Sequence, residues 1–240
     1  MLQRIDAVLS FAIANNWRER ASACIGARQV LGSRRNGEDR HHRFLPYQEV
    51  PAFLARLRAS KRTLTKLALE WLILTAARSG ETRLACWSEV DEKAAEWTIP
   101  AARMKARRTH VVPLSSRCLE MLREARTMHQ DCDLIFPGAN RKPLSDMAMT
   151  KVLRDMGLAE RATVHGMRSA FKLWCAEVAK VADEVSEAAL AHTIREKVRA
   201  AYLRTDFLEE RRVLMARWAA FVAPAEATAP RVEARAARSR

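Results

Sequence analysis

Apolar residues recur along much of the chain at spacings of three and four, which places them on one face of an α-helix. In the first such stretch, within residues 1–31, these positions are Ile5, Val8, Leu9, Ala12 and Ile13. The same pattern predicts further helices at Ala52 to Arg58, Thr63 to Ala77, Ser116 to His129, Ser145 to Met156, Thr163 to Val181, a stretch carrying Tyr202, and Phe207 to Val222. We therefore expect a chain that is mainly α-helical.

After Glu81 the pattern changes to short runs that are rich in β-branched and aromatic residues. The runs are CWSEV (Cys86 to Val90), EWTIP (Glu96 to Pro100) and THVVPL (Thr109 to Leu114), separated by the turn-like DEK and the basic MKARR. Three such runs so close together predict a small antiparallel sheet. The expected fold class is thus mainly α with a small three-stranded antiparallel β-sheet.

Basic and Pro/Ala-rich stretches suggest where domains begin and end. GSRRNGEDRHHR, from Gly32 to Arg43, is typical of a linker, and the tail from Pro224 is typical of a disordered segment. We expect a helical piece at 1–31, a basic linker at 32–45, the main domain at 46–223 and a disordered basic tail at 224–240. The piece at 1–31 is too short to bury its own apolar face, so we expect it to pack elsewhere or to be the remnant of something larger.

Charge and composition narrow the kind of partner. Of the 240 residues 49% are apolar, and the formal net charge is +14. This excess of positive charge favours a polyanionic partner, with nucleic acid as the first candidate and an anionic membrane surface as the second. The longest apolar run, Leu67 to Ala77, contains Glu70 and is too short to span a bilayer. The five scattered cysteines predict reduced thiols and suggest no metal site: Cys24, Cys86, Cys118, Cys132 and Cys175.

Two positions in TVHGMRSAF could bind phosphate. His165 and Arg168 are three residues apart and would share one face of a helix. Thr163 is a good N-cap, so we expect His165 in the first helical turn, where free backbone N–H groups favour a phosphate. The alternative is a capping histidine and a solvated arginine.

Arg78, in TAARSGE, is expected to close the apolar helix before it, with Gly80 ending the turn. Its simplest role there is to neutralise the C-terminal end of the helix dipole. A guanidinium on a rigid element also offers two parallel N–H bonds to phosphate oxygens. Considered alone, Arg78 favours the first interpretation.

Lys105, in MKARRTH, is the only lysine between Lys93 and Lys142, and it lies in a predicted strand connection among arginines. A crowded lysine can give up its proton, whereas arginine stays protonated near neutrality. A site that protonates a leaving alkoxide therefore has reason to use lysine here. The alternative is a solvated basic hairpin that touches DNA backbone.

Tyr202, in VRAAYLRTD, is one of only two tyrosines in the chain. Its phenol, with a pKa of about 10, is a poor nucleophile unless cations and a base stabilise the phenolate. Surrounded by the residues above and by His192 of LAH, it could attack a phosphodiester. Otherwise it is a core tyrosine with a satisfied hydroxyl.

In their order along the chain these motifs resemble those of the tyrosine recombinase family, and most of all its phage- and genomic-island-type integrases. The resemblance runs from about Leu45 to Val222. It rests on Arg78 in ARSGE, Lys105 before THVVPLS, His165 and Arg168 in HGMR, LAH with His192, and Tyr202 in KVRAAYLR. It implies the tyrosine recombinase catalytic fold for residues 46–223.

The resemblance also implies a mechanism. Tyr202 would attack the scissile DNA phosphate, forming a 3′-phosphotyrosyl link and freeing a 5′-hydroxyl. Arg78 and Arg168 would clamp the non-bridging oxygens. Lys105 would protonate the leaving oxygen and His165 would act as acid and base, while the side chain at 192 would hydrogen-bond the phosphate. Neither a metal nor another cofactor would be needed.

The implied partners are double-stranded DNA attachment sites and further copies of the chain, without a membrane, in the bacterial cytoplasm at the nucleoid. In the family a terminal helix often docks on a neighbouring protomer of the DNA-bound tetramer, so Phe207 to Val222 is expected to join a homo-oligomer. Packing of its apolar stripe on its own domain is the alternative.

Several features depart from the family. Ser79 stands where the closest relatives usually have proline, and TIREK replaces a Gly-Asn-containing turn after His192. Residues 1–31 resemble only the last part of the core-binding domain that usually precedes the catalytic one. We therefore expect a chain truncated at its N-terminal side.

Three other functions compete with an integrase. One is a catalytically impaired DNA-binding remnant, and another is a tyrosine-type topoisomerase, which shares the catalytic chemistry. The third is a metal-dependent nuclease or transposase, which needs clustered carboxylates. Its only candidates are Asp131, Asp133 and Asp146.

Overall fold

The computed structural model describes residues 2–19, 24, 43–129, 132–192 and 206–224. The chain divides into two compact units, Met1–His41 and His42–Arg240. The first contains helix α1 (Leu2–Ala14), which lies within the helical stretch expected at 1–31. Several of its apolar side chains are exposed, Val8 and Phe11 most of all.

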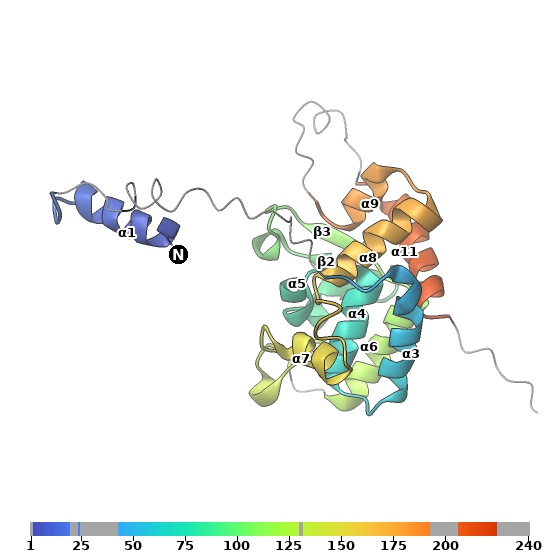
Figure 1. The fold of residues 1–240 in the computed structure, drawn as a ribbon. Helices are drawn as coiled ribbons and strands as arrows, with labels where there is room; N and C mark the ends of the chain where they lie inside the picture. Colours follow the sequence, from blue (N-terminus) through green and yellow to red (C-terminus); the bar gives the residue numbers. More distant parts are fainter. Residues whose placement is uncertain (1, 20–23, 25–42, 130–131, 193–205, 225–240) are drawn as a thin grey trace, which may run out of the picture. The chain divides into compact units, whose positions relative to one another are not determined.

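Helix α4 (Leu64–Thr75) is the centre of the second unit. It contacts helices α3, α5, α6, α7, α8 and α11, which lie around it in Figure 1. The Thr63 hydroxyl caps it by accepting the backbone N–H of Lys66 at 3.3 Å. At its other end Ala76 adopts a left-handed conformation, so the helix stops short of the expected Ala77.

The other helices of the described residues fall close to the expected positions, with two that the periodicity did not predict. Those two are α5 (Ser79–Arg83) and α9 (Asp183–Ala189). The rest are α3 (Val50–Ala59), α6 (Ser116–Met128), α7 (Ala148–Asp155), α8 (Gly166–Trp174) with a π-helical continuation η5 (Cys175–Ala179), and α11 (Leu208–Val222). Short 3₁₀ turns are η1 (Tyr47–Glu49), η2 (Trp87–Glu89), η3 (Ala101–Arg103) and η4 (Ala139–Arg141).

The predicted three-stranded antiparallel sheet is present, with β1 (Val90–Asp91), β2 (Glu96–Ile99) and β3 (His110–Pro113) in that order. Trp97 pairs with Val112, and Ile99 pairs with His110. The first strand was expected over CWSEV, and that prediction is wrong. There Trp87 donates its backbone N–H to Asp133 at 2.7 Å and the chain forms the turn η2, so only the last residue of the run joins the sheet.

Two aromatic groups fill the core on either side of α4. Trp71 of α4 packs edge-on against Trp97 of the sheet and against Phe136. On the other side Trp218 of α11 packs against Trp174 of α8, and its indole N–H donates to the carbonyl of Ile73 at 2.8 Å. A buried indole with a satisfied N–H is a strong hydrophobic anchor.

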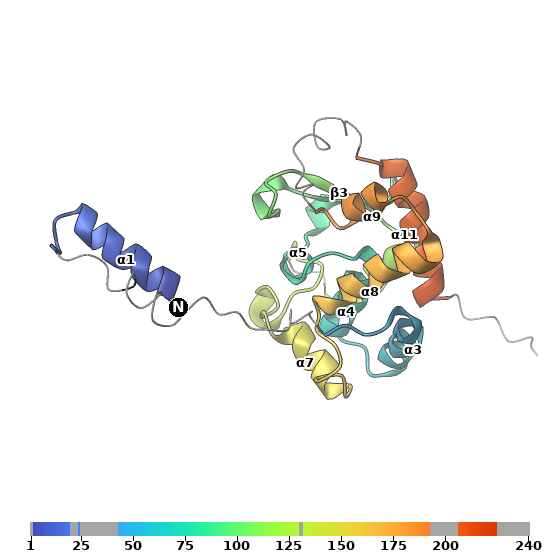
Figure 2. The same cartoon turned by 45° about the horizontal axis from the view of Figure 1, so that its top comes forward.

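The apolar stripe of α11 therefore packs on its own domain. Leu214, Met215, Trp218 and Val222 are all buried, whereas Val213 on the same helix is 61% exposed. In the views of Figures 1 and 2, α11 lies against α9 at one side of the unit. Of the two expectations for this stripe, the one that describes this structure is packing within the chain.

Arginine–carboxylate contacts tie the helices together. The carboxylate of Glu70 in α4 is fully buried and contacts Arg58, Arg62 and Arg117 at 2.7, 3.1 and 2.9 Å. Burial raises the pKa of Glu70, but the hydrogen bond from Arg117 and the charge of Arg58 outweigh it, so the pKa is lowered. A charge inside a central helix is thus neutralised by its neighbours.

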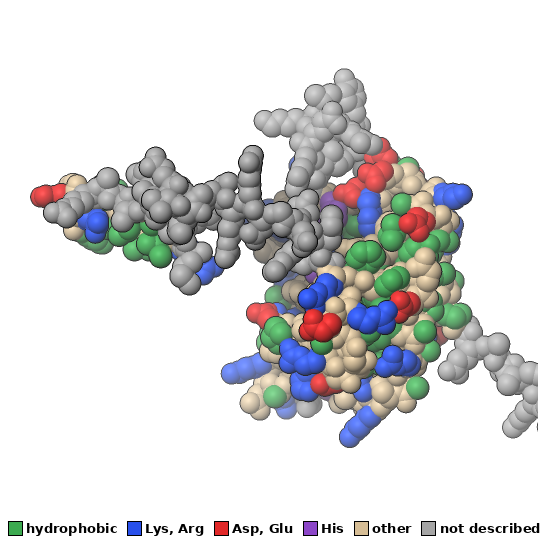
Figure 3. Space-filling model, in the orientation of Figure 1, with side chains coloured by type: hydrophobic (Ala, Val, Ile, Leu, Met, Phe, Trp, Pro, Cys, Tyr) green, Lys and Arg blue, Asp and Glu red, His purple; other side chains and the backbone are tan. Residues whose placement is uncertain are grey.

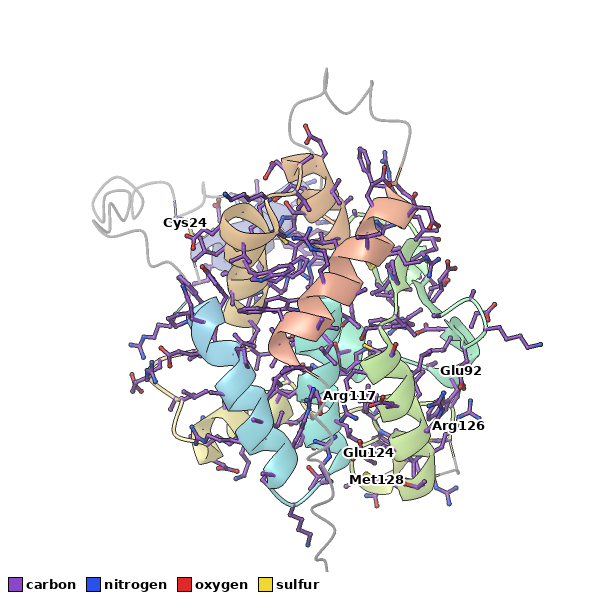
Figure 4. All side chains as sticks on the ribbon, turned by 90° about the vertical axis from the view of Figure 1, so that its right-hand side faces the viewer. Cys24, Glu92, Arg117, Glu124, Arg126 and Met128 are labelled. Atoms are coloured by element: carbon purple, nitrogen blue, oxygen red, sulfur yellow. The ribbon has the colours of Figure 1, made fainter. Side chains whose placement is uncertain are left out.

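An ion pair also ties helix α6 to the turn after β1. In Figure 4 Glu92 lies next to Arg126 of this helix, and the two form an ion pair of 2.7 Å. Lysine and arginine side chains stand at many points of the face shown in Figure 3. Within the described residues, every helix falls short of the length or the apolar character that a bilayer-spanning segment needs.

Candidate active site

Arg78 lies at the start of α5, as its N-cap residue. The expectation that it closes the preceding helix is wrong, because α4 ends at Thr75 and Gly80 lies inside α5. Glu81, one turn later, holds Arg78 twice. Its carboxylate accepts the backbone N–H at 2.7 Å and contacts Nη1 at 2.7 Å. The guanidinium is thereby fixed on a rigid element.

Arg168, in the first turn of α8, is 5% exposed. Its Nη1 donates to the carbonyl of Ala76 and its Nη2 donates to the carbonyl of Leu190 at 2.6 Å, while the buried Nε–H has no hydrogen-bond partner. Burial, and next the charge of Arg78, lowers the pKa of Arg168 to about 10. A buried guanidinium with an unused donor and a like charge beside it favours the binding of an anion.

The two guanidiniums converge on one oxygen. Arg78 Nη2 lies 3.4 Å from the carbonyl of Leu190, which Arg168 also contacts, and 3.2 Å from the carbonyl of Ala191. These carbonyls follow helix α9. The end of α9 thus holds two cations side by side, although they are 90 positions apart in the sequence.

A pocket of about 570 Å³ opens beside this pair. Besides Arg78 and Arg168 its lining includes Lys105 and His165. Lys105 is exposed and lies between η3 and β3, in the connection where the sequence placed it. Arg103 fastens this connection to α5 by donating to the carbonyl of Leu84 at 2.5 Å. The pocket therefore brings four of the six candidate residues together.

His165 stands immediately before α8, one position ahead of the first helical turn where it was expected. The N-cap position is therefore His165 and not the expected Thr163, although the Thr163 hydroxyl accepts the backbone N–H of Gly166, the first residue of α8, at 2.9 Å. The carbonyl of Arg43 accepts the backbone N–H of Thr163 at 3.0 Å. This close crossing of the chain at Arg43 accounts for the glycine, because a Cβ on Gly166 would lie 2.2 Å from that carbonyl oxygen.

His192 borders the site through its contacts. Its Nε2 lies 3.3 Å from Nη2 of Arg168, and its Nδ1 lies 2.9 Å from a carboxylate oxygen of Glu187. Burial lowers the pKa of His192; Glu187 opposes this effect, and the charges of Arg168 and Arg78 add to it. The fifth candidate is thus in direct contact with one arginine of the pair.

Tyr202, the sixth candidate, lies outside the described residues, as does the helix expected around it. The chain resumes at Asp206, which is held by Arg211 of α11. Arg211 is 2% exposed, contacts the Asp206 carboxylate at 3.0 Å and donates to the carbonyl of Val111 in β3 at 2.6 Å. Arg211 thereby joins the start of α11 to β3.

Comparisons with known proteins agree with this arrangement. Residues 43–209 match the model of the phage integrase family. The chain belongs to that family. The integrase of Enterobacteria phage P4 is 33% identical over 92% of this chain and 53% of its own length. Prophage integrase IntZ of Escherichia coli K12 is 36% identical over 78% of this chain and 46% of its own length. The chain spans about half the length of these curated relatives.

The solved structures show the same fold. A lambda integrase tetramer bound to a Holliday junction aligns with a TM-score of 0.58 and 16% identity, covering 82% of this chain and 58% of that one. The predicted tyrosine recombinase catalytic fold, helical with a small antiparallel sheet, is therefore confirmed.

The structure adds two residues to the candidate site. Glu81 holds Arg78, and Glu187 holds His192. Glu81 could have been noticed, since a glutamate three residues after a helix start is a capping signal. Glu187 carries no such local signal, because its role depends on where α9 ends.

The carboxylates considered for a metal-dependent nuclease have other contacts. Asp133 accepts from the Ser88 hydroxyl at 2.7 Å, and Asp146 pairs with Arg83. Asp131 lies outside the described residues. Among the described side chains, no three His, Cys, Asp or Glu residues gather in the way a bound metal ion needs.

Proposed function

We propose that this chain is the catalytic part of a site-specific DNA recombinase that cleaves and rejoins DNA through a 3′-phosphotyrosyl intermediate. The observation that carries the proposal is the convergence of Arg78 and Arg168 on the carbonyl of Leu190, beside a pocket that Lys105 and His165 also line. Two guanidiniums offer parallel donors for the two non-bridging oxygens of a phosphodiester. A membrane surface needs no such convergence.

In the cleavage step, each of these side chains has a separate role. The Tyr202 oxygen forms a bond to phosphorus while the bond from phosphorus to the 5′ oxygen breaks. His165 takes the phenol proton, and Lys105 gives a proton to the leaving oxygen. Arg78 and Arg168 stabilise the charge that develops on the phosphoryl oxygens. The reverse attack, by the hydroxyl of a partner strand, rejoins the DNA.

Trapping the covalent intermediate tests the proposal. The substrates are nicked duplexes that together cover the DNA flanking the gene for this chain. The nick lets cleavage release a short strand, so that the step cannot reverse. The wild-type chain should give a protein–DNA adduct that survives detergent, undiminished by EDTA. Tyr202→Phe, which removes one oxygen, should abolish the adduct, and Arg168→Ala should slow its formation by about 10² or more. Absence of a wild-type adduct on every duplex would refute catalysis.

The net charge of +14 also fits one alternative, a catalytically impaired DNA-binding protein of this family. Such a protein would bind DNA with a steep salt dependence and form no adduct. Tyr202→Phe would then change nothing. The two functions therefore differ in the same trapping experiment.

The proposed partner is double-stranded DNA at an attachment site, bound by several copies of the chain. Assembly through helix Phe207 to Val222 remains part of the proposal. Because its apolar stripe is buried in its own domain, the contact would use the outward face, where Val213 is exposed. Val213→Lys should then weaken assembly on DNA, measured by the number of copies per duplex, without lowering stability.

A further inference from the structure

The end of helix α9 holds His192 through one residue, Glu187, in two ways. The backbone carbonyl of Glu187 accepts the backbone N–H of His192 at 3.0 Å, and its carboxylate lies 2.9 Å from the ring Nδ1. The backbone bond belongs to a helix end of the Schellman type, in which Ala191 takes the left-handed position and donates to Ala188 at 3.0 Å. Both the position and the rotation of the imidazole are therefore set by Glu187.

The other face of the imidazole meets Arg168. A guanidinium carries only donors, so at 3.3 Å from Nη2 the His192 Nε2 must be the acceptor. The ring proton then lies on Nδ1 and is donated to Glu187. The surroundings thus define one neutral tautomer of His192 in the free protein.

When a phosphate binds, Nε2 of His192 must donate a hydrogen bond, whereas in the free protein it accepts one. A phosphoryl oxygen is only an acceptor, so His192 can hydrogen-bond it only through an Nε2–H. The imidazole must therefore take up one proton from solvent while Nδ1 keeps its own. The charged groups facing it are Arg168 of α8, Arg78 of α5 and Glu187 of α9, and only the last favours the imidazolium.

We propose that Glu187 is a positioning residue for the recombination reaction, which orients His192 and stabilises its protonated form when the scissile phosphate binds. This inference rests on the proposed function. It assigns to Glu187 an action through His192 and no contact with DNA.

Glu187 is itself held in place. Lys172 of α8 contacts its second carboxylate oxygen at 2.6 Å, and the same ammonium contacts Asp183 at 2.6 Å and the Ser186 hydroxyl at 2.7 Å. Burial raises the pKa of Glu187, but the hydrogen bonds from Lys172 and His192 outweigh it and the pKa is lowered. The carboxylate therefore stays ionised beside the imidazole.

A double-mutant cycle on adduct formation tests this role. Glu187→Gln keeps a hydrogen-bond acceptor for Nδ1 and removes the charge. It should slow adduct formation about tenfold near pH 8 and less near pH 6, because protonation of His192 becomes the limiting requirement. In the His192→Ala background the same change should have no further effect. Asp155→Asn, which also removes a carboxylate paired with a lysine (Lys151), is the matched control and should leave the rate unchanged.

A second measurement separates this inference from the proposed function. Nitrogen-15 NMR of the imidazoles, titrated with and without inorganic vanadate, reports the tautomer and pKa of His192 whether or not the chain cleaves DNA. We expect the Nδ1–H tautomer in the wild type and a lower pKa in Glu187→Gln. Two results would overturn the inference. One is that Glu187→Gln slows adduct formation equally in the wild-type and His192→Ala backgrounds. The other is that Glu187→Gln leaves the titration of His192 unchanged. If the wild type forms no adduct but the NMR shows the expected tautomer and the lower His192 pKa in Glu187→Gln, only the recombinase function is overturned.

Discussion

The backbone of Arg43 and Phe44 passes close to Gly166, beside the candidate site, and Gly166→Ala tests whether that crossing positions the candidate catalytic side chains. A Cβ at this position would lie 2.2 Å from the carbonyl oxygen of Arg43 and 2.9 Å from the Cα of Phe44. Both are backbone atoms, so no side chain can rotate away. Ordinary contact begins at 3.4 Å, so the two segments must separate by about 1 Å.

The loss of stability can be estimated from the hydrogen bonds that this separation would break. The carbonyl of Arg43 accepts from the backbone and the hydroxyl of Thr163, at 3.0 and 3.2 Å. Each such bond contributes about 1 kcal/mol, and crowding of packed backbone adds a similar amount. Alanine favours a helix over glycine by up to about 1 kcal/mol, which offsets part of the loss. We therefore expect the free energy of unfolding to fall by about 2 kcal/mol.

We expect Gly166→Ala to affect the rate of adduct formation more strongly than the free energy of unfolding. His165 precedes Gly166 and Arg168 follows it, so a shift of about 1 Å displaces both groups from the phosphate and should lower the rate of adduct formation by about 10². Urea unfolding and single-turnover trapping measure the two quantities. Gly80→Ala is the control for stability, because its added Cβ meets nothing within 4 Å, and it should stabilise the protein slightly. A Gly166→Ala protein as stable as the wild type, with full activity, would refute this reasoning.

Two further changes test stability alone. Glu70→Gln should lower the free energy of unfolding by about 3 kcal/mol, because three arginines lose their buried carboxylate. The lowered pKa of Glu70 means that its ionic contribution is complete above the unfolded-state pKa of about 4. That contribution is lost as pH falls through the folded-state pKa, so denaturation at a series of pH values should show a shallower acid loss in the variant. Ala191→Gly should raise the free energy of unfolding by about 0.5–1 kcal/mol in urea, because Ala191 has a φ of 48°. An unchanged midpoint in either variant would contradict the assignment concerned.

The helices could be predicted because their cause is local. Apolar positions at helical spacing determine which face of α4, α6 or α11 can be buried, whatever it packs against. The hydroxyls of Thr63 and Thr163 each accept a backbone N–H three residues later, and both residues lie at or close to the helix starts that the sequence predicted. The order of the motifs, from Arg78 to Tyr202, was likewise sufficient to identify the family.

The failed predictions share a different cause, which is contact between distant segments. CWSEV has the composition of a strand, yet Asp133, more than 40 residues away, holds Trp87 and Ser88 in a turn. Arg78 follows an apolar helix, yet that helix ends before it at the left-handed Ala76, whose carbonyl accepts from the distant Arg168. Local propensity is weak compared with such tertiary hydrogen bonds.

Residue types, helix periodicity and motif order thus indicated the fold class and the family from the chain alone. The pairing of Arg78 with Arg168 on one carbonyl, the close approach of Arg43 to Gly166 and the contact of Glu187 with His192 emerged only on folding. The physical reason is range: periodicity acts over a few residues, whereas hydrogen bonds and like-charge contacts require atoms a few ångströms apart, and only the packed tertiary structure decides which distant atoms meet.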